Sequence, residues 1–254
     1  MAIRYEKKLA AMYFKLRSKK YIASNGVEVK YILEKNTGNN APFTVIFSAF
    51  PREGMKATYN YLKTLGNYKA NKLFILDDYG HEHRGAYYLA EQGDFRIEVA
   101  IDELIEKMRR NLKPQKTVFI GTSKGGFAAL YYGLKCDVDY IIAGAPQYKL
   151  GNYLSDVPLK KPILKSIMGN HSQESITLLN SLLPAVIKKY NGNCRVFLHY
   201  STQEHTYDEH IATLIDDLNA NEISLEQDEC QYKEHQEVSR YFPPYLLETV
   251  EKLK

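Results

Sequence analysis

The feature of this sequence that most constrains its fold is a serine framed by glycines between a strand pattern and a helix pattern. Residues 117–120 are β-forming, residues 121–125 read Gly-Thr-Ser-Lys-Gly, and a run of small residues with helical character follows. In this context the spacing G-x-S-x-G predicts a sharp turn whose glycines let strand and helix approach closely. Such a turn presents the Ser123 hydroxyl at a helix N-terminus, where backbone N–H groups favour developing negative charge. The pattern therefore predicts that Ser123 is a nucleophile.

Three other interpretations of this turn were weighed. A phosphate-binding loop requires a lysine after its last glycine, but Phe127 follows Gly126. A Ser-Lys dyad is disfavoured because neighbouring side chains on a tight turn point apart. We instead expect Lys124 to contribute its backbone N–H to an oxyanion hole, with its ammonium group at the rim of the site. An ordinary strand–glycine–helix connection is the remaining alternative.

The length and composition fit one α/β domain over residues 1–254. The net charge is only +4, and no block of Lys and Arg has the density of a nucleic-acid patch, so no nucleic-acid partner is expected. The three cysteines are widely spaced and form neither a disulfide framework nor a metal signature, which favours a reducing, cytoplasmic location. The sequence has no signal-peptide pattern and no apolar run long enough to span a bilayer, so we expect no integral membrane segment.

Strand and helix patterns alternate along most of the chain. A hairpin is predicted over residues 21–33, around the Ser-Asn-Gly turn at 24–26. Further strands are predicted over residues 43–50, 72–76, 140–143, 195–200 and 223–232, and further helices over residues 4–16, 56–65, 97–112, 207–218 and 245–253. Strands that alternate with helices predict an α/β fold with a mostly parallel central sheet flanked by helices.

The alternation changes over residues 147–190, where short helical pieces are separated by prolines and a glycine. An insertion here follows the strand after the nucleophile helix, which is where a lid would cover the site. We therefore predict a small helical cap over these residues, with Tyr148 and Tyr153 among the side chains that line an acyl or glycan pocket.

A second oxyanion donor is expected from the loop that follows the strand at 43–50. In a serine hydrolase of this architecture, the loop after this strand supplies one N–H to the oxyanion. We assign this donor to Phe50 N–H, with Ala49 N–H as the alternative.

A serine nucleophile also needs an imidazole base and a carboxylate that orients it. On a parallel sheet these groups come from loops at the carboxyl ends of strands, in the chain order serine, acid, histidine. His235 follows the last predicted strand, and Glu204 follows the strand before it. A capping box of Thr206 and Glu209 would place Asp208 in a first helical turn, where the helix dipole already accounts for an acid. We therefore predict Glu204 as the acid and keep Asp208 as the alternative.

The other histidines fit the base position less well. His171 lies in the predicted cap, His199 in a strand and His210 in a helix, while His205 precedes the last strand. The histidines near Glu204 lack the H-E-x-x-H spacing of a zinc site, and the His-x-His pair at 81–83 is a poor ligand spacing. We expect neither a metal nor a cofactor.

The elbow at 121–126, the loop at Phe50, Glu204 and His235 together resemble the α/β-hydrolase fold, from about residue 27 to the C-terminus. The Ser-Lys-Gly-Gly form of the elbow is similar to a bacterial subgroup tied to capsular polysaccharide biosynthesis and to the acetyltransferase-like component of the accessory Sec system. This resemblance implies esterase or O-acyltransferase chemistry on glycans or glycoconjugates. The sequence departs from the family at the oxyanion loop, where the usual His-Gly is Ser48-Ala49.

The sequence thus predicts a serine-dependent acyl ester hydrolase or O-acyltransferase that works through an acyl-enzyme. Its substrate is expected to be a small-molecule or glycan ester. The alternative is a non-catalytic scaffold with the same fold in a surface-polysaccharide or secretion assembly, because a fold does not by itself imply a function.

Overall fold

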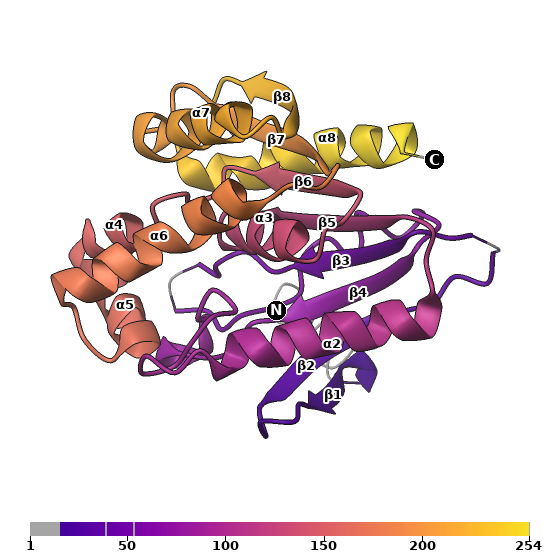
Figure 1. Ribbon diagram of the computed structural model, residues 1–254, viewed down its shortest axis with the longest axis horizontal. Helices are drawn as coiled ribbons and strands as arrows, with labels where there is room; N and C mark the ends of the chain where they lie inside the picture. The colour runs from indigo at the N-terminus through magenta and orange to yellow at the C-terminus, as the bar shows by residue number, and fades with distance from the viewer. Residues whose placement is uncertain (1–15, 39, 53, 254) are drawn as a thin grey trace, which may run out of the picture.

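The centre of the fold is one eight-stranded sheet with strand order β1-β2-β4-β3-β5-β6-β7-β8 (Figure 1). The computed structural model describes residues 16–38, 40–52 and 54–253. The strands are β1 (Lys19–Ile22), β2 (Glu28–Glu34), β3 (Phe43–Phe47), β4 (Asn71–Leu76), β5 (Thr117–Thr122), β6 (Tyr140–Gly144), β7 (Arg195–Ser201) and β8 (Ser224–Cys230). β1 and β2 form the predicted hairpin and β2 pairs antiparallel with β4, whereas β4, β3 and β5 to β8 run parallel. The predicted mostly parallel sheet is confirmed.

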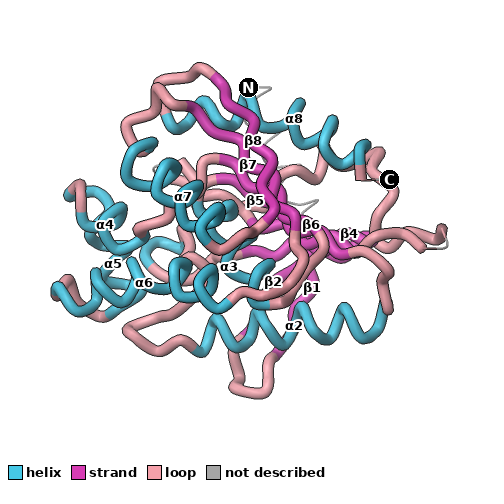
Figure 2. Tube along the Cα trace, turned by 45° about the horizontal axis from the view of Figure 1, so that its top comes forward, coloured by secondary structure: helices cyan, strands magenta, loops and turns pink. Residues whose placement is uncertain are grey.

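Helices cover both faces of this sheet (Figures 1 and 2). They are α2 (Arg96–Leu112), α3 (Lys124–Lys135), α4 (Leu150–Ser155), α5 (Lys161–Met168), α6 (Gln173–Lys189), α7 (Thr213–Ala220) and α8 (Val238–Lys252). Apolar side chains of α2, α3 and α6 pack on one face, and those of α8 and of residues 57–70 pack on the other. β3 and β5 are buried along their whole length, as expected of apolar strands covered on both faces.

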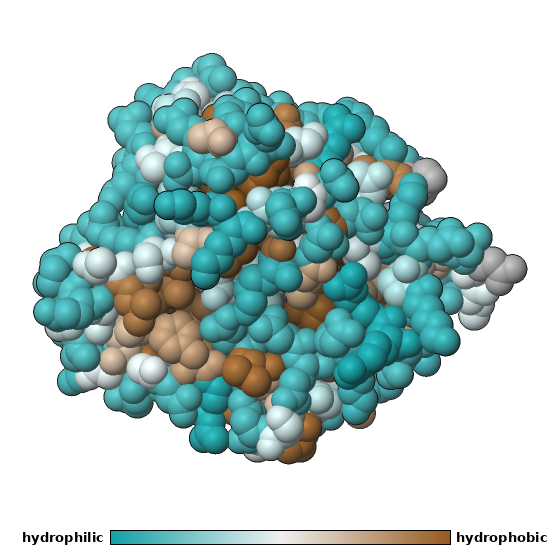
Figure 3. Space-filling view, viewed as in Figure 1, coloured by the Kyte–Doolittle hydropathy of each residue, from teal (hydrophilic) through white to brown (hydrophobic). Residues whose placement is uncertain are grey.

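The helices α4, α5 and α6 form a group of their own, at the left of Figure 1. They occupy the region of residues 147–190 in which short helical pieces were predicted. α6 is longer than expected, because it runs through Pro184 without a break. Apolar side chains reach the surface where Figure 1 draws α5 and α6, on a face that is otherwise largely hydrophilic (Figure 3).

One predicted helix cannot be compared with the structure, and two others differ from it. The helix over residues 4–16 falls outside the described residues, apart from its last position. Residues 56–65 form turns instead of a helix, with Tyr61 in a left-handed conformation (φ 61°) and its hydroxyl 2.7 Å from Thr122 Oγ1. The closing helix starts at Val238 and not at 245. The predicted start lay after Pro243 and Pro244, but both prolines lie inside the helix. Within the described part of the chain, no helix is long and apolar enough to cross a membrane.

The turn between β5 and α3 leaves no room for side chains at its glycines. A Cβ on Gly121 would lie 2.0 Å from Gly125 O, and one on Gly125 would lie 2.5 Å from Phe47 O at the end of β3. Ser123 lies between them with φ 52° and ψ −121°, a conformation that L-residues rarely adopt. The two glycines therefore allow the strand, the turn and the helix to pack backbone against backbone.

This packing predicts a large penalty for a methyl group at Gly125. Gly125→Ala should lower the free energy of unfolding by about 1–3 kcal/mol, because backbone must move to relieve the clash. Gly66→Ala is the matched control, since Gly66 is exposed and a Cβ there would lie 3.2 Å from its nearest neighbour, the backbone oxygen of Lys63. Urea denaturation measures both variants, and equal losses would contradict the prediction.

Candidate active site

Three side chains from the carboxyl ends of β5, β7 and β8 meet in one hydrogen-bonded line. His235 Nε2 lies 2.7 Å from Ser123 Oγ, and His235 Nδ1 lies 2.5 Å from Glu204 Oε1. Ser123 and Glu204 are buried, while the side chain of His235 is 22% exposed. The structure thus brings together the three residues that the sequence selected, in an arrangement able to move a proton from a hydroxyl to an imidazole.

A buried serine fixes the loops that carry Glu204 and His235. Ser201 Oγ at the end of β7 accepts hydrogen bonds from Gln203 N–H (3.1 Å) and Tyr232 N–H (3.0 Å), and donates one to Tyr232 O (2.6 Å). These contacts join the end of β7 to the chain just past β8. The short segments from there to Glu204 and to His235 are therefore held beside each other.

Glu204 is held as a carboxylate. Burial acts to raise its pKa, but hydrogen bonds from His235 and from Thr206 outweigh burial and hold the pKa below its usual value. Thr206 Oγ1 donates to Glu204 Oε1 at 2.5 Å. The predicted capping box of Thr206 with Glu209 is wrong, because the Thr206 hydroxyl is used by Glu204 and caps no helix.

Asp208, the alternative acid, forms no hydrogen bond or ion pair with the imidazole in the described part of the chain. It is exposed in a π-helical turn, Tyr207–Ala212, that precedes α7. The contact of His235 Nδ1 is with Glu204. The geometry therefore favours Glu204 over Asp208.

Neither of the two backbone N–H groups predicted as oxyanion donors has a hydrogen-bond acceptor among the described residues. Lys124 is the first residue of α3, where an N–H has no partner within its helix. In the loop after β3, Ala49 N–H donates to Asn60 Oδ1 (2.9 Å), whereas Phe50 N–H has no acceptor among the described residues. The engagement of Ala49 leaves Phe50 as the better candidate of the two.

The Lys124 side chain lies elsewhere than predicted. Instead of reaching the rim, its ammonium group is fully buried and forms an ion pair with Asp77 Oδ2 at 2.8 Å. Burial lowers the pKa of Lys124, and the Asp77 carboxylate opposes this effect. Asp77 also accepts hydrogen bonds from Ala86 N–H and Tyr88 N–H. The ion pair thus ties the residue after the nucleophile to the loop that follows β4.

Gln147 is a contact of the nucleophile that the sequence did not reveal. Its side chain is buried just after β6, and Nε2 lies 3.0 Å from Ser123 Oγ and 3.3 Å from His235 Nε2. Its Oε1 accepts a hydrogen bond from Tyr87 at 3.4 Å. Its position after β6 could have indicated this contact, because loops at the carboxyl ends of parallel strands carry the ligand-binding residues.

Another histidine, His199, makes its contacts outside this line of residues. His199 is buried and bonds through Nδ1 to Asp228 (2.6 Å), with Cys230 Sγ 4.0 Å away. Among the residues that the structure describes, this is the one His/Cys/Asp/Glu group with ligand atoms close enough to hold a metal. Within that same part of the chain, the histidines near Glu204 form no second group of this kind, and Glu204 is engaged by His235.

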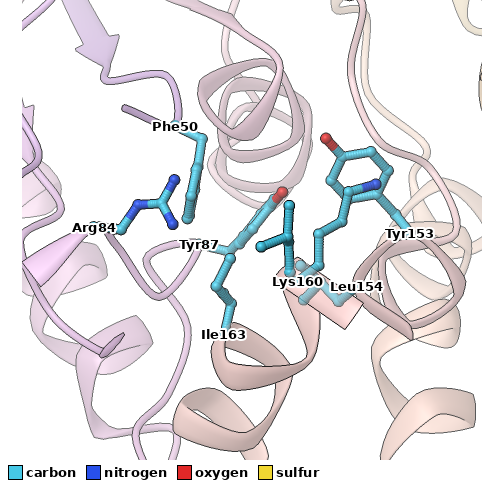
Figure 4. Close-up of a pocket in the computed structure, with 8 residues that line it drawn as sticks. Phe50, Arg84, Tyr87, Tyr153, Leu154, Lys160 and Ile163 are labelled. Atoms are coloured by element: carbon cyan, nitrogen blue, oxygen red, sulfur yellow. The ribbon is translucent and has the colours of Figure 1, made fainter. Parts of the chain in front are cut away.

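An apolar cavity of about 180 Å³ lies beside this line of residues (Figure 4). Tyr153 lines it, as predicted, and its ring centre lies 6.5 Å from that of His235. Tyr148 is instead fully buried and donates a hydrogen bond to Asp217. The complete lining consists of Phe50, Arg84, Tyr87, Tyr153, Leu154, Leu159, Lys160 and Ile163.

Comparison with solved structures identifies the architecture. A capsule O-acetyltransferase of Neisseria meningitidis serogroup A superposes with a TM-score of 0.75, at 20% identity, over 94% of this chain and 99% of that one. A fluorophosphonate-binding serine hydrolase of Staphylococcus aureus superposes with a TM-score of 0.64, at 12% identity, over 92% and 97%. The chain has the α/β-hydrolase fold. No protein-family model matches the chain.

Among curated proteins, the chain is similar to an accessory Sec system protein of Staphylococcus aureus. The two are 30% identical over 182 residues, which is 66% of this chain. The chain spans about a third of the length of that relative, since the match covers 33% of it. These similarities agree with the resemblance to the capsular and accessory Sec subgroup found in the sequence.

The buried Lys124–Asp77 pair predicts an asymmetric effect of charge removal. Lys124→Met leaves the Asp77 carboxylate buried without its partner and should cost about 3–5 kcal/mol of unfolding free energy. The double variant Lys124→Met/Asp77→Asn should recover part of that loss. Arg195→Met, which breaks an exposed ion pair with Glu226, should cost about 1 kcal/mol or less. A Lys124→Met loss no greater than that of Arg195→Met in urea denaturation would refute the prediction.

The hydrogen bond from Gln147 predicts a role in orienting the Ser123 hydroxyl. Gln147→Ala should slow labelling of Ser123 by a fluorophosphonate about tenfold, because one hydrogen bond to the nucleophile is lost. Gln203→Ala is the control, since Gln203 is exposed and its side chain bonds to Gln231. Labelling rates measured by mass spectrometry test both, and an unchanged rate for Gln147→Ala would exclude the role.

Proposed function

We propose that this chain is a serine-dependent acyl ester hydrolase or O-acyltransferase that works through an acyl-enzyme. The observation that carries the proposal is the line of contacts from Glu204 through His235 to Ser123 Oγ, with 2.5 Å and 2.7 Å between the paired atoms. A serine hydroxyl is a weak nucleophile until a base accepts its proton. His235 is in contact with that hydroxyl, and Glu204 is a carboxylate that stabilises the imidazolium that would form.

In the proposed reaction, Ser123 Oγ attacks the ester carbonyl while His235 Nε2 takes its proton. The carbonyl oxygen becomes an oxyanion held by the N–H groups of Lys124 and Phe50, each commonly worth about 2–4 kcal/mol in the transition state. The intermediate collapses when His235 returns the proton to the departing alcohol, which leaves an ester on Ser123. A water molecule or a sugar hydroxyl then attacks this acyl-enzyme by the reverse steps, with His235 again as the base.

We further propose that the acceptor or ester is a glycan or glycoconjugate and that helices α4, α5 and α6 act as a cap. The support for the glycan is the similarity to a capsule O-acetyltransferase and to an accessory Sec system protein. The support for the cap is that Tyr153 and Lys160, from α4 and the turn after it, line the cavity beside His235. In this scheme the cap decides whether water or a sugar hydroxyl reaches the acyl-enzyme.

Substitution of the three residues tests the mechanism on p-nitrophenyl acetate and longer p-nitrophenyl esters. Ser123→Ala and His235→Ala should lower kcat about 10³-fold or more, and Glu204→Gln should lower it by a comparable factor, since triad members act as a unit. Asp208→Asn is the matched acid control and should stay within about twofold, as exposed residues away from the chemistry usually do. If Asp208→Asn had a lower kcat than Glu204→Gln, Glu204 would not be the acid.

A fluorophosphonate probe separates the enzyme from a scaffold. The proposed enzyme should label at Ser123 in the wild type and lose labelling in Ser123→Ala and His235→Ala. A wild type that hydrolyses no ester and takes no label would overturn the proposal and favour a non-catalytic scaffold in a surface-polysaccharide or secretion assembly.

A further inference from the structure

The cavity beside the nucleophile contains two cationic side chains and no carboxylate among its lining residues. Arg84 lies on one side, against the ring of Phe50, and Lys160 lies on the other, against the ring of Tyr153 (Figure 4). The rest of the lining is apolar or aromatic. Two positive charges on opposite walls of a small apolar cavity form an unusual combination, because no carboxylate lines either wall.

The Arg84 guanidinium is only partly satisfied. Its centre lies 4.8 Å from the centre of the Phe50 ring, and Nη2 donates to Pro51 O at 3.3 Å. Its Nε is buried and has no hydrogen-bond partner among the described residues. A buried donor without an acceptor is unfavourable, and a bound oxyanion would satisfy it, since a guanidinium presents its N–H groups in a fork that matches carboxylate and phosphate.

The Lys160 ammonium is also without an ion-pair partner in the described part of the chain. It lies 3.3 Å from the centre of the Tyr153 ring. Burial lowers the pKa of Lys160, and the nearby Asp156 carboxylate offsets this effect only in part. A ligand anion in the cavity would supply the missing counter-charge.

The cavity is joined to the reacting atoms on three sides. Phe50, whose N–H is the proposed oxyanion donor, forms one wall. Tyr87 donates to Gln147, which in turn bonds to Ser123 Oγ. Tyr153 lies beside His235. An ester bound at Ser123 would therefore extend one of its ends into this cavity.

We propose that the cavity is a subsite for an anionic group, a carboxylate or phosphate on the ester substrate, which Arg84 and Lys160 bind from opposite sides. This inference rests on the proposed function, because it takes Ser123 as the reacting centre. The anion belongs either to the acyl group or to the alcohol of the ester. Both sources share the same chemistry at the cavity, and matched substrates distinguish them.

Two pairs of esters, each an anionic and a neutral member of similar size, test the subsite. The acyl pair is mono-p-nitrophenyl glutarate with p-nitrophenyl pentanoate. The alcohol pair is 6-O-acetylglucose 1-phosphate with 6-O-acetylglucose, followed by acetate release. In at least one pair the wild type should prefer the anionic member by about tenfold or more in kcat/KM, as charge-assisted hydrogen bonds would give. The pair that shows the preference identifies the end of the ester that enters the cavity.

Variants then assign the preference to the two cations. Arg84→Met and Lys160→Met should each reduce the ratio of anionic to neutral kcat/KM, chiefly through KM, and the double variant should bring it to about one. Arg84→Lys should retain part of the ratio. Arg52→Met and Lys161→Met, which remove exposed charges outside the cavity lining, should leave the ratio at the wild-type value. The inference would be overturned by an active wild type that shows no preference in either pair, or by a preference that survives the double variant. Either result would leave the proposed function standing.

A binding measurement keeps the test independent of turnover. Mono-p-nitrophenyl glutarate and 6-O-acetylglucose 1-phosphate are titrated calorimetrically into Ser123→Ala and into Ser123→Ala/Arg84→Met/Lys160→Met. At least one ligand should bind the first protein about tenfold or more tightly than the second. Equal affinities for both ligands would contradict the subsite, whereas failure of the proposed function is seen separately, as a wild type that takes no fluorophosphonate label.

Discussion

The structure depends on one backbone contact, the approach of the turn at Ser123 to the end of β3. Gly125 lies so close to Phe47 O that no side chain fits between them, and Gly121 lies as close to Gly125 O. This contact sets the distance between two loops of different origin. One loop carries Ser123, the proposed nucleophile, and Lys124 N–H, and the other carries Phe50 N–H. The spacing of the proposed oxyanion donors is therefore a property of backbone packing and not of flexible side chains.

A second constraint holds the other half of the site. Hydrogen bonds of Ser201 join the end of β7 to the chain just past β8, so the two segments that carry Glu204 and His235 are anchored at one point. Because parallel strands end at the same edge of the sheet, the two loops arrive beside Ser123 without a long excursion. The buried Lys124–Asp77 pair fixes the opposite flank of the turn. The turn that carries Ser123 is thus held from several directions by buried contacts.

Much of this arrangement could be predicted because its signals are local. Apolar runs identified the buried strands, and the glycine spacing identified the turn at Ser123. Chain order on a parallel sheet indicated His235 and the loop that carries both Glu204 and Asp208. Glu204 was preferred there through a capping box that the structure does not form, and it is Glu204 that contacts His235. What the sequence could not reveal depends on pairing across the chain. Lys124 was expected at the rim because its partner Asp77 lies 47 positions away, and Gln147 carries no motif of its own. Residues 56–65 do not form the predicted helix. Asn60 bonds to Ala49 N–H and Tyr61 bonds to Thr122, and these tertiary contacts outweigh the local helix propensity.

Phe50 has two places in the candidate site, one through its backbone amide and the other through its ring. Its amide is the proposed oxyanion donor, while its ring forms a wall of the cavity and carries Arg84 on one side. Every residue other than proline has the amide, whereas the ring is specific to a few. Substitution of this side chain, or of Arg84 and Lys160, would therefore change what the cavity admits without disturbing the groups proposed to perform the chemistry. Evolution would then change which ligands bind in the cavity and leave the proposed catalytic groups in place.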